Sequence, residues 1–279
     1  MEPGYADRPR VAFVFSGHGS QWIGMGRELM DASPAFSAAL IRCDEAVRAE
    51  TGWSVIDRLS DGSDLVNETV AIVHPVLWAV QVALAETWRA WGVEPDVVIG
   101  HSMGESAAAA VSGALSLADA ARVVCRRSRL IRDRVAGKGT MSVAALTAAE
   151  AEKLIGELAV EVSVAASNGP RTTVLAGEVE GIEKIKAELD ARDVFCRVMK
   201  AEAASHCSQM DPVLAELAEE LKGLEPRAGR TPCAPPSPAN SWTAPASTPP
   251  TGPATSAAAC TSTRPSSAPP PRPPRSSSR

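Results

Sequence analysis

The chain has 279 residues, of which 45% are hydrophobic, and a net charge of −5, and its length suits one large globular domain or two small ones. The charge is unevenly distributed, because residues 226–279 carry six Arg and no acidic residue, so the first 225 residues carry −11. An acidic body of this kind excludes nucleic-acid binding as the main task.

The cysteines and the first residues indicate the compartment. The six cysteines are dispersed and form no C-x-x-C pair, which predicts reduced thiols and neither a disulfide frame nor a zinc site. The first ten residues are polar and charged, so we expect no signal peptide. No apolar run approaches the length needed to span a membrane. We therefore expect a cytoplasmic protein.

The chain begins with an apolar strand at residues 11–15 and a polar, glycine-rich loop at 16–21. Such a loop presents backbone N–H groups to a ligand or is an ordinary strand–helix connection. Residues 73–91 predict a long core helix, with Pro75 in its first turn. His74 then stands at the helix start, as a cap or a packing residue.

Residues 97–104, Val-Val-Ile-Gly-His-Ser-Met-Gly, combine a short buried strand with the G-x-S-x-G nucleophile elbow. Side chains at Gly100 or Gly104 would clash with a neighbouring strand or helix. The pattern predicts an exposed nucleophile, Ser102, facing the N-terminus of the next helix, which suits a developing oxyanion. The alternative is a glycine-bounded turn with an idle serine.

Arg127 lies on a predicted helix that ends near residue 134. Its neighbours three and four positions away are all apolar, so we expect the guanidinium to face inward and to need an anionic partner. That partner is either a protein carboxylate or the carboxylate of a substrate. Arg126 and Arg129 are predicted to be solvated. The four apolar neighbours are Val123, Val124, Leu130 and Ile131.

Residues 137–199 predict a separate unit inserted in the larger α/β unit. The expected elements follow the order β-α-β-β-α-β, which is the ferredoxin-like pattern. Residues 167–171, Ser-Asn-Gly-Pro-Arg, predict the hairpin between its two middle strands.

A serine nucleophile needs a general base, and the chain has four histidines. The side chain of His101 should point to the opposite side of the strand from Ser102, and His74 is explained by the helix start. His18 and His206 remain, and spacing cannot decide between them.

Together these segments resemble the acyltransferase domain of type I modular polyketide synthases and the related malonyl-CoA:acyl-carrier-protein transacylases. The resemblance implies an α/β fold with an α/β-hydrolase-like large subdomain (8–136 and 200–225) and an inserted ferredoxin-like small subdomain (137–199). The matching segments are 15–22, 100–105, 125–129, 167–170 and 204–206.

The resemblance also implies the role of each site residue. Ser102 would be the nucleophile and His206 its base, with the backbone N–H groups of His18 and Met103 forming the oxyanion hole. Arg127 would bind the free carboxylate of a malonyl unit bidentately. Three further residues would lie in the substrate-binding site, namely Gly17, Asn168 and Ser205.

The implied reaction is ping-pong transfer of a malonyl-type extender unit from coenzyme A to an acyl carrier protein, beside a ketosynthase and other synthase domains. No metal or bound cofactor is implied beyond the coenzyme A thioester and the carrier's phosphopantetheine. Residues 203–206, Ala-Ala-Ser-His, are closer to the methylmalonyl-selective Tyr-Ala-Ser-His than to the malonyl-selective His-Ala-Phe-His. We therefore expect methylmalonyl, with malonyl the alternative.

The resemblance ends near Pro232, and residues 226–279 contain 15 of the 22 prolines and no Val, Ile, Leu, Met, Phe or Tyr. This composition predicts a disordered tail. It indicates an out-of-frame reading that truncates the domain, or alternatively a native linker. In the family a carbonyl from the missing part orients the catalytic histidine, so we expect low stability and weak activity. The alternative functions are an inactive fragment and a serine esterase or thioesterase.

Overall fold

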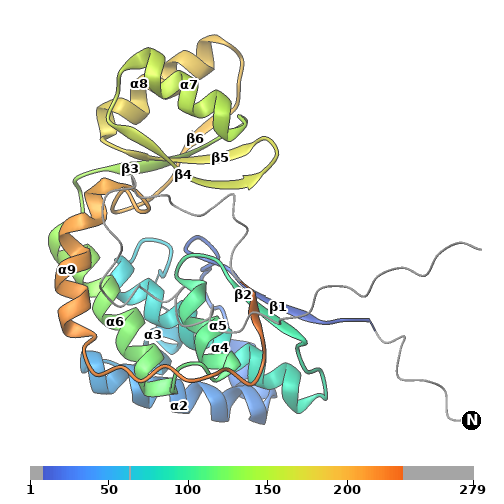
Figure 1. The fold of residues 1–279 in the computed structure, drawn as a ribbon. Coiled ribbons are helices and arrows are strands. Elements are labelled where there is room, and N and C mark those ends of the chain that lie inside the picture. Colours follow the sequence, from blue (N-terminus) through green and yellow to red (C-terminus); the bar gives the residue numbers. More distant parts are fainter. Residues whose placement is uncertain (1–8, 63, 235–279) are drawn as a thin grey trace, which may run out of the picture.

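The computed structural model describes residues 9–62 and 64–234, which form two α/β subdomains (Figure 1). The large subdomain is built on a parallel sheet of order β1-β2-β7, and the small subdomain on an antiparallel sheet of order β4-β5-β3-β6. In Figure 1 the small subdomain lies above the large one, and the chain crosses between them twice. The backbone N–H of Gly137 on one crossing donates to the carbonyl of Glu202 on the other at 2.7 Å.

The large subdomain begins with strand β1 (Ala12–Phe15), which pairs in parallel with β2 (Val97–Gly100). Phe15, Val98 and Gly100 face inward and are buried, as a half-covered strand requires. The helices of this subdomain are α1 (Arg27–Ala32), α2 (Pro34–Thr51), α3 (Val55–Ser60), α4 (Val70–Ala90), α5 (Gly104–Ser112), α6 (Leu117–Arg134) and α9 (Asp211–Glu220), with a 3-10 turn η1 (Ser208–Met210).

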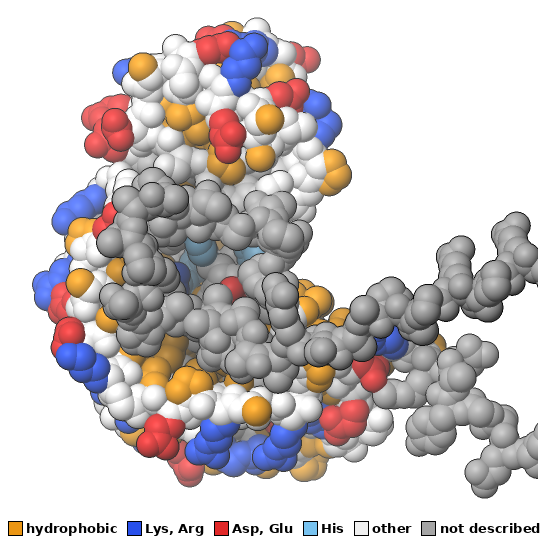
Figure 2. Space-filling model, in the orientation of Figure 1, with side chains coloured by type: hydrophobic (Ala, Val, Ile, Leu, Met, Phe, Trp, Pro, Cys, Tyr) orange, Lys and Arg blue, Asp and Glu red, His pale blue; other side chains and the backbone are white. Residues whose placement is uncertain are grey.

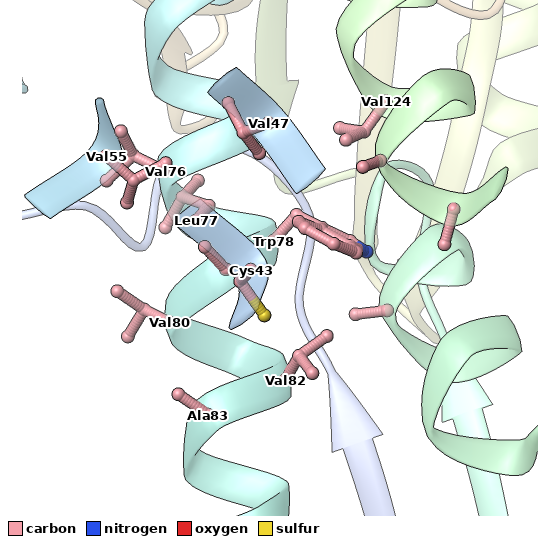
Figure 3. Packing of buried hydrophobic residues seen from close by; sticks show 14 of the residues in the cluster. Cys43, Val47, Val55, Val76, Leu77, Trp78, Val80, Val82, Ala83 and Val124 are labelled. Carbon is pink, nitrogen blue, oxygen red and sulfur yellow. The ribbon is translucent and has the colours of Figure 1, made fainter. Parts of the chain in front are cut away.

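Helix α4 is the centre of the core. Trp78 on α4 is fully buried and points toward α6, which contributes Val124 (Figure 3). Among the described residues, α4 is the one helix long and apolar enough by length and composition to cross a membrane, and 78% of its most apolar window is buried. The expectation that no apolar run reaches that length was therefore wrong, although the prediction of a core helix was right.

The start of α4 differs from the expectation. The helix begins at Val70, so Pro75 lies inside it and His74 is a buried residue of its second turn rather than a cap. The Glu202 carboxylate accepts a hydrogen bond from the Val70 N–H at 3.0 Å. A carboxylate at a helix N-terminus is stabilising, and this one comes from a segment far away in the chain, which local sequence patterns do not reveal.

The third strand, β7 (Cys233–Ala234), lies in the segment that was predicted to be a disordered tail from residue 226. Backbone hydrogen bonds hold this segment: Arg230 N–H donates to the carbonyl of Ser112 at 2.7 Å, and Val98 N–H donates to that of Pro232 at 2.9 Å. Such bonds need no large apolar side chain, so composition misplaced the boundary. The remaining predicted tail, 235–279, lies outside the described residues.

One cysteine differs from the expectation of reduced thiols. Cys43, Cys125, Cys196 and Cys207 are buried free thiols, as predicted. Cys233 is disulfide-bonded, which the absence of a C-x-x-C pattern does not exclude, because disulfides also join cysteines that are distant in the chain.

The small subdomain has the predicted β-α-β-β-α-β element order. Its core contains Leu175, Ile182 and Ile185, all fully buried and separate from the core of the large subdomain. A two-residue turn joins the middle strands, as the hairpin pattern predicted. The elements are β3 (Thr140–Ala144), α7 (Ala148–Leu158), β4 (Val162–Gly169), β5 (Thr172–Gly177), α8 (Val179–Ala191) and β6 (Cys196–Val198).

Candidate active site

The elbow is a tight backbone turn between β2 and α5. A Cβ added at Gly100 would lie 2.4 Å from Glu105 Cα, and one added at Gly104 would lie 2.2 Å from the Phe15 carbonyl oxygen. Both contacts are shorter than any side chain tolerates, which confirms the predicted requirement for glycine. Ser102 between them has a φ of 55°, a left-handed conformation that is costly for a non-glycine residue and typical of functional sites.

The side chains of Ser102 and His206 contact each other, although Ser102 follows β2 and His206 follows the second crossing between the subdomains. Ser102 Oγ lies 2.8 Å from His206 Nε2, a distance at which an imidazole accepts the hydroxyl proton. Of the two histidines that sequence left as candidate bases, His206 is the one in hydrogen-bond contact with the serine. His206 also has a positive φ, 63°.

Neighbouring groups set the charge of His206. Burial, followed by the charges of Arg127 and His101, lowers the pKa of His206 to about 4. His206 lines the cavity and is itself an exposed residue. Because of its lowered pKa, His206 is neutral at pH 7, the state that a general base requires.

A cavity of about 150 Å³ lies beside these two residues, at the hollow between the subdomains where Figure 2 shows histidine side chains. It brings together most of the predicted site residues from segments distant in the chain. Met103 is the exception, since its buried side chain does not line the cavity. The predicted residues that line it are Gly17, His18, Ser102, Arg127, Asn168, Ser205 and His206.

The loop after β1 lies against the elbow. A Cβ at Gly17 would be 3.4 Å from Ser102 Cβ and 3.2 Å from the His101 carbonyl oxygen, so the backbone of this loop passes close to the serine. On the other side, Met103 immediately precedes α5, where the first N–H groups have no partner within the helix. Gly17, which precedes His18, thus lies beside Ser102, and Met103 follows Ser102 directly in the chain.

Arg127 faces inward and lines the cavity, as its apolar neighbours predicted. Burial lowers the pKa of Arg127, and the negative charge of Glu105 opposes this shift. Within the described residues the guanidinium makes no hydrogen bond or ion pair, which leaves it available for an anion. By contrast, Arg126 pairs with Glu50 at 2.9 Å; the prediction that Arg126 is merely solvated was wrong, because α2 and α9 pack beside α6.

Among the residues that line the cavity, sequence reasoning missed three titratable ones, His74, His101 and Glu202. The side chain of His101 was expected on the opposite side of the strand from Ser102. The left-handed turn at Ser102 ends the alternation of side chains between the two faces of the strand. His74 was assigned to a helix start that lies four residues earlier. Glu202 carried no signal in the sequence. In the described part of the chain, no group of three or more His, Cys, Asp or Glu is placed to hold a metal ion.

Comparisons with known proteins agree with this geometry. The acyl transferase domain family matches residues 12–240. Polyketide synthase GfsA of Streptomyces halstedii is 46% identical over 224 residues, which is 80% of this chain and 3% of that protein. The chain therefore spans a small part of this curated relative.

Two solved structures illustrate the structural similarity. The acyltransferase domain from module 8 of the salinomycin polyketide synthase has a TM-score of 0.77 and 40% identity, over 81% of this chain and 53% of that one. A malonyl-transacylase solved in complex with its type II polyketide synthase acyl-carrier protein has a TM-score of 0.74 and 27% identity. The match covers 81% of this chain and 74% of that one.

Proposed function

This chain belongs to the acyl transferase domain family, and from that premise we propose that it transfers a malonyl-type acyl group from coenzyme A to an acyl carrier protein through an ester on Ser102. The observation that carries the proposal is the 2.8 Å contact between Ser102 Oγ and His206 Nε2. Beside it lies the inward guanidinium of Arg127, which makes no hydrogen bond or ion pair with the residues that the structure describes. We assign the two subdomains to the α/β-hydrolase-like and ferredoxin-like folds.

In the first half-reaction, Ser102 Oγ attacks the thioester carbonyl while His206 Nε2 takes the hydroxyl proton. The backbone N–H groups of His18 and Met103 stabilise the oxyanion. The C–S bond then breaks, and the coenzyme A sulfur leaves with the proton from His206. The product is an acyl-Ser102 ester.

In the second half-reaction, the thiol of the carrier's phosphopantetheine gives its proton to His206 and attacks the ester carbonyl. The C–O bond breaks, and Ser102 Oγ recovers the proton. Arg127 binds the free carboxylate of the acyl group bidentately in both steps, which fixes the carbonyl near the serine. Asn168, Ser205 and Gly17 line the same space.

We propose methylmalonyl as the preferred unit and malonyl as the second. The cavity wall includes the apolar side chains of Val70, Ile131 and Met199 and the small Ala203. An apolar wall with free volume favours an α-methyl group by about 1 kcal/mol. We further propose a cytoplasmic location beside a ketosynthase and other polyketide synthase domains; the solved transacylase complex with a carrier protein supports the carrier as partner.

Intact-protein mass spectrometry tests this function. The full chain is incubated briefly with malonyl-CoA or methylmalonyl-CoA, and Ser102→Ala is the control. We expect a mass gain of one acyl group in the unchanged protein and none in the variant, with faster labelling by methylmalonyl-CoA. Absence of a Ser102-dependent gain would overturn the proposal. Rapid loss of the acyl group to water, together with equal reaction with neutral acyl esters, would instead indicate an esterase or thioesterase.

A further inference from the structure

Two histidines in the cavity wall have no task in the proposed reaction beyond the backbone N–H of one of them. His18 comes from the loop after β1, and His74 from the second turn of α4. Their rings meet edge to face, with centroids 5.4 Å apart and planes inclined by 70°. Both residues line the cavity that holds Ser102 and Arg127.

One ring nitrogen of each imidazole has no hydrogen-bond partner in the described part of the chain. The Nδ1 atoms of His18 and His74 are enclosed, and neither makes a hydrogen bond within the described residues. His74 is only 6% exposed. An enclosed ring nitrogen without a partner is costly, and the protein offers none to either Nδ1 atom among the described residues. Both residues also line the cavity, where a ligand can approach the rings.

The charges around this pair indicate which kind of ligand it takes. Burial and the positive charge of Arg127 lower the pKa of His74, with a further contribution from His18. Burial lowers the pKa of His18, and the carboxylate of Glu202 opposes that shift. The other charged or titratable groups around the cavity are Glu105, which acts on Arg127, and His101 and His206. In the empty cavity both rings are thus neutral beside a positive charge.

We propose that the His18–His74 pair forms, with Arg127, a second contact for the free carboxylate of the acyl group, and that the pair takes up a proton when the carboxylate binds. This inference rests on the proposed function and extends it to a substrate-recognition residue, His74. The carboxylate offsets the positive charge of Arg127, which after burial is the second cause of the lowered pKa of His74. His74 then binds a proton from solvent and donates a charge-assisted hydrogen bond to the carboxylate.

Proton uptake by His74 makes substrate binding depend on pH. The pKa of His74 is higher in the complex than in the empty site, so the substrate binds more tightly as the pH falls between these two pKa values. Within that window, each unit of pH changes the dissociation constant by up to tenfold. Below the pKa of the empty site the effect is fully present, and it is lost as the pH rises through the pKa of the complex.

Calorimetry on the full chain counts the protons. Ser102→Ala is titrated with malonyl-CoA in buffers of different ionisation enthalpy at one pH, and acetyl-CoA, which lacks the carboxylate, is the matched ligand. We expect malonyl-CoA to take up more protons than acetyl-CoA, by as much as one. Adding His74→Gln, which keeps a hydrogen-bond donor but does not titrate, should abolish the excess. An excess that is absent, or that survives His74→Gln, would overturn the inference.

A second measurement leaves the histidines intact. Ring-labelled histidine gives signals from only four residues, and with malonyl-CoA one should move to the imidazolium position at pH 7, whereas acetyl-CoA should not move it. If neither ligand moves a signal, the pair does not take up a proton. Failure of the proposed function is distinguishable, because then the unchanged protein forms no Ser102 ester and both proposals fall together.

Discussion

The proposed nucleophile, Ser102, and its proposed base, His206, both have left-handed backbones, but different structures hold them there. Ser102 is fixed by backbone packing, since Gly100 and Gly104 bring α5 against the end of β1. His206 lies in a segment without helix or strand, where the buried Ala204 and Cys207 anchor it and the Cys207 thiol donates to the Ala204 carbonyl at 3.2 Å. The position of Ser102 is therefore fixed by the elbow, whereas the position of His206 depends on how the segment between the subdomains packs.

The largest expected effect is on the base itself. His206→Ala should slow formation of the acyl-Ser102 ester by about 10²–10⁴-fold, because the serine loses its proton acceptor. Its stability should change by less than about 1 kcal/mol, since the ring faces the cavity mouth and not the core. Single-turnover labelling with malonyl-CoA measures the rate, and urea unfolding measures the stability. A rate within threefold of the unchanged protein would place the base elsewhere, with His18 the next candidate.

The elbow should respond in the opposite way, by losing stability. Gly104→Ala places a Cβ on the Phe15 carbonyl oxygen and should cost on the order of 3 kcal/mol, because backbone cannot move aside. Gly92→Ala is the control without a clash: nothing lies within 4 Å of its added Cβ. Gly92, unlike Gly104, has a positive φ, 80°, so only the left-handed conformation is penalised, by about 1–2 kcal/mol. Equal urea midpoints for the two variants would contradict packing at the elbow.

The same contrast explains what the sequence could predict. The elbow, the hairpin at 167–171 and the inward face of Arg127 depend on residues close in the chain, and all three were predicted correctly. His206 contacts Ser102 from 104 positions away, and spacing alone left His18 equally possible; the resemblance to a family, not the pattern of residues, favoured His206. Assigning their chemical roles still requires the experiments above.

Two of the errors come from contacts with distant segments, and the third comes from a local turn. The start of α4 was placed late because Glu202 supplies its N-terminal hydrogen bond. Strand β7 was taken for tail because backbone pairing with β2, not apolar side chains, holds it. His101 was oriented by strand alternation, which the turn at Ser102 interrupts.

A smaller expected effect concerns the stability of the fold at acid pH. Burial lowers the pKa values of His18, His74 and His206, the last to about 4. The unfolded chain, with pKa values near 6.5, binds more protons than the folded one, so stability is fully present above about pH 6.5 and declines as the pH falls toward 4. The urea midpoint should be lower at pH 5 than at pH 7.5.

That acid sensitivity should become weaker in His74→Gln, which removes one buried titrating group. Gly92→Ala keeps all three histidines and should show the same difference between pH 5 and pH 7.5 as the unchanged protein. If the midpoint is equally sensitive to pH in His74→Gln, buried carboxylates rather than the cavity histidines govern acid unfolding.

The smallest expected effect tests whether the packing around Cys207 holds His206 against Ser102. Cys207→Ala removes the thiol that donates to the Ala204 carbonyl and should cost about 1 kcal/mol or less, yet it should slow acylation several-fold, because the neighbouring His206 is no longer held against Ser102. Cys43→Ala is the control, since Cys43 is equally buried but belongs to the core around α2. It should cost similar stability and leave the acylation rate unchanged. Equal rates for the two variants would mean that His206 is held by the fold as a whole, as Ser102 is.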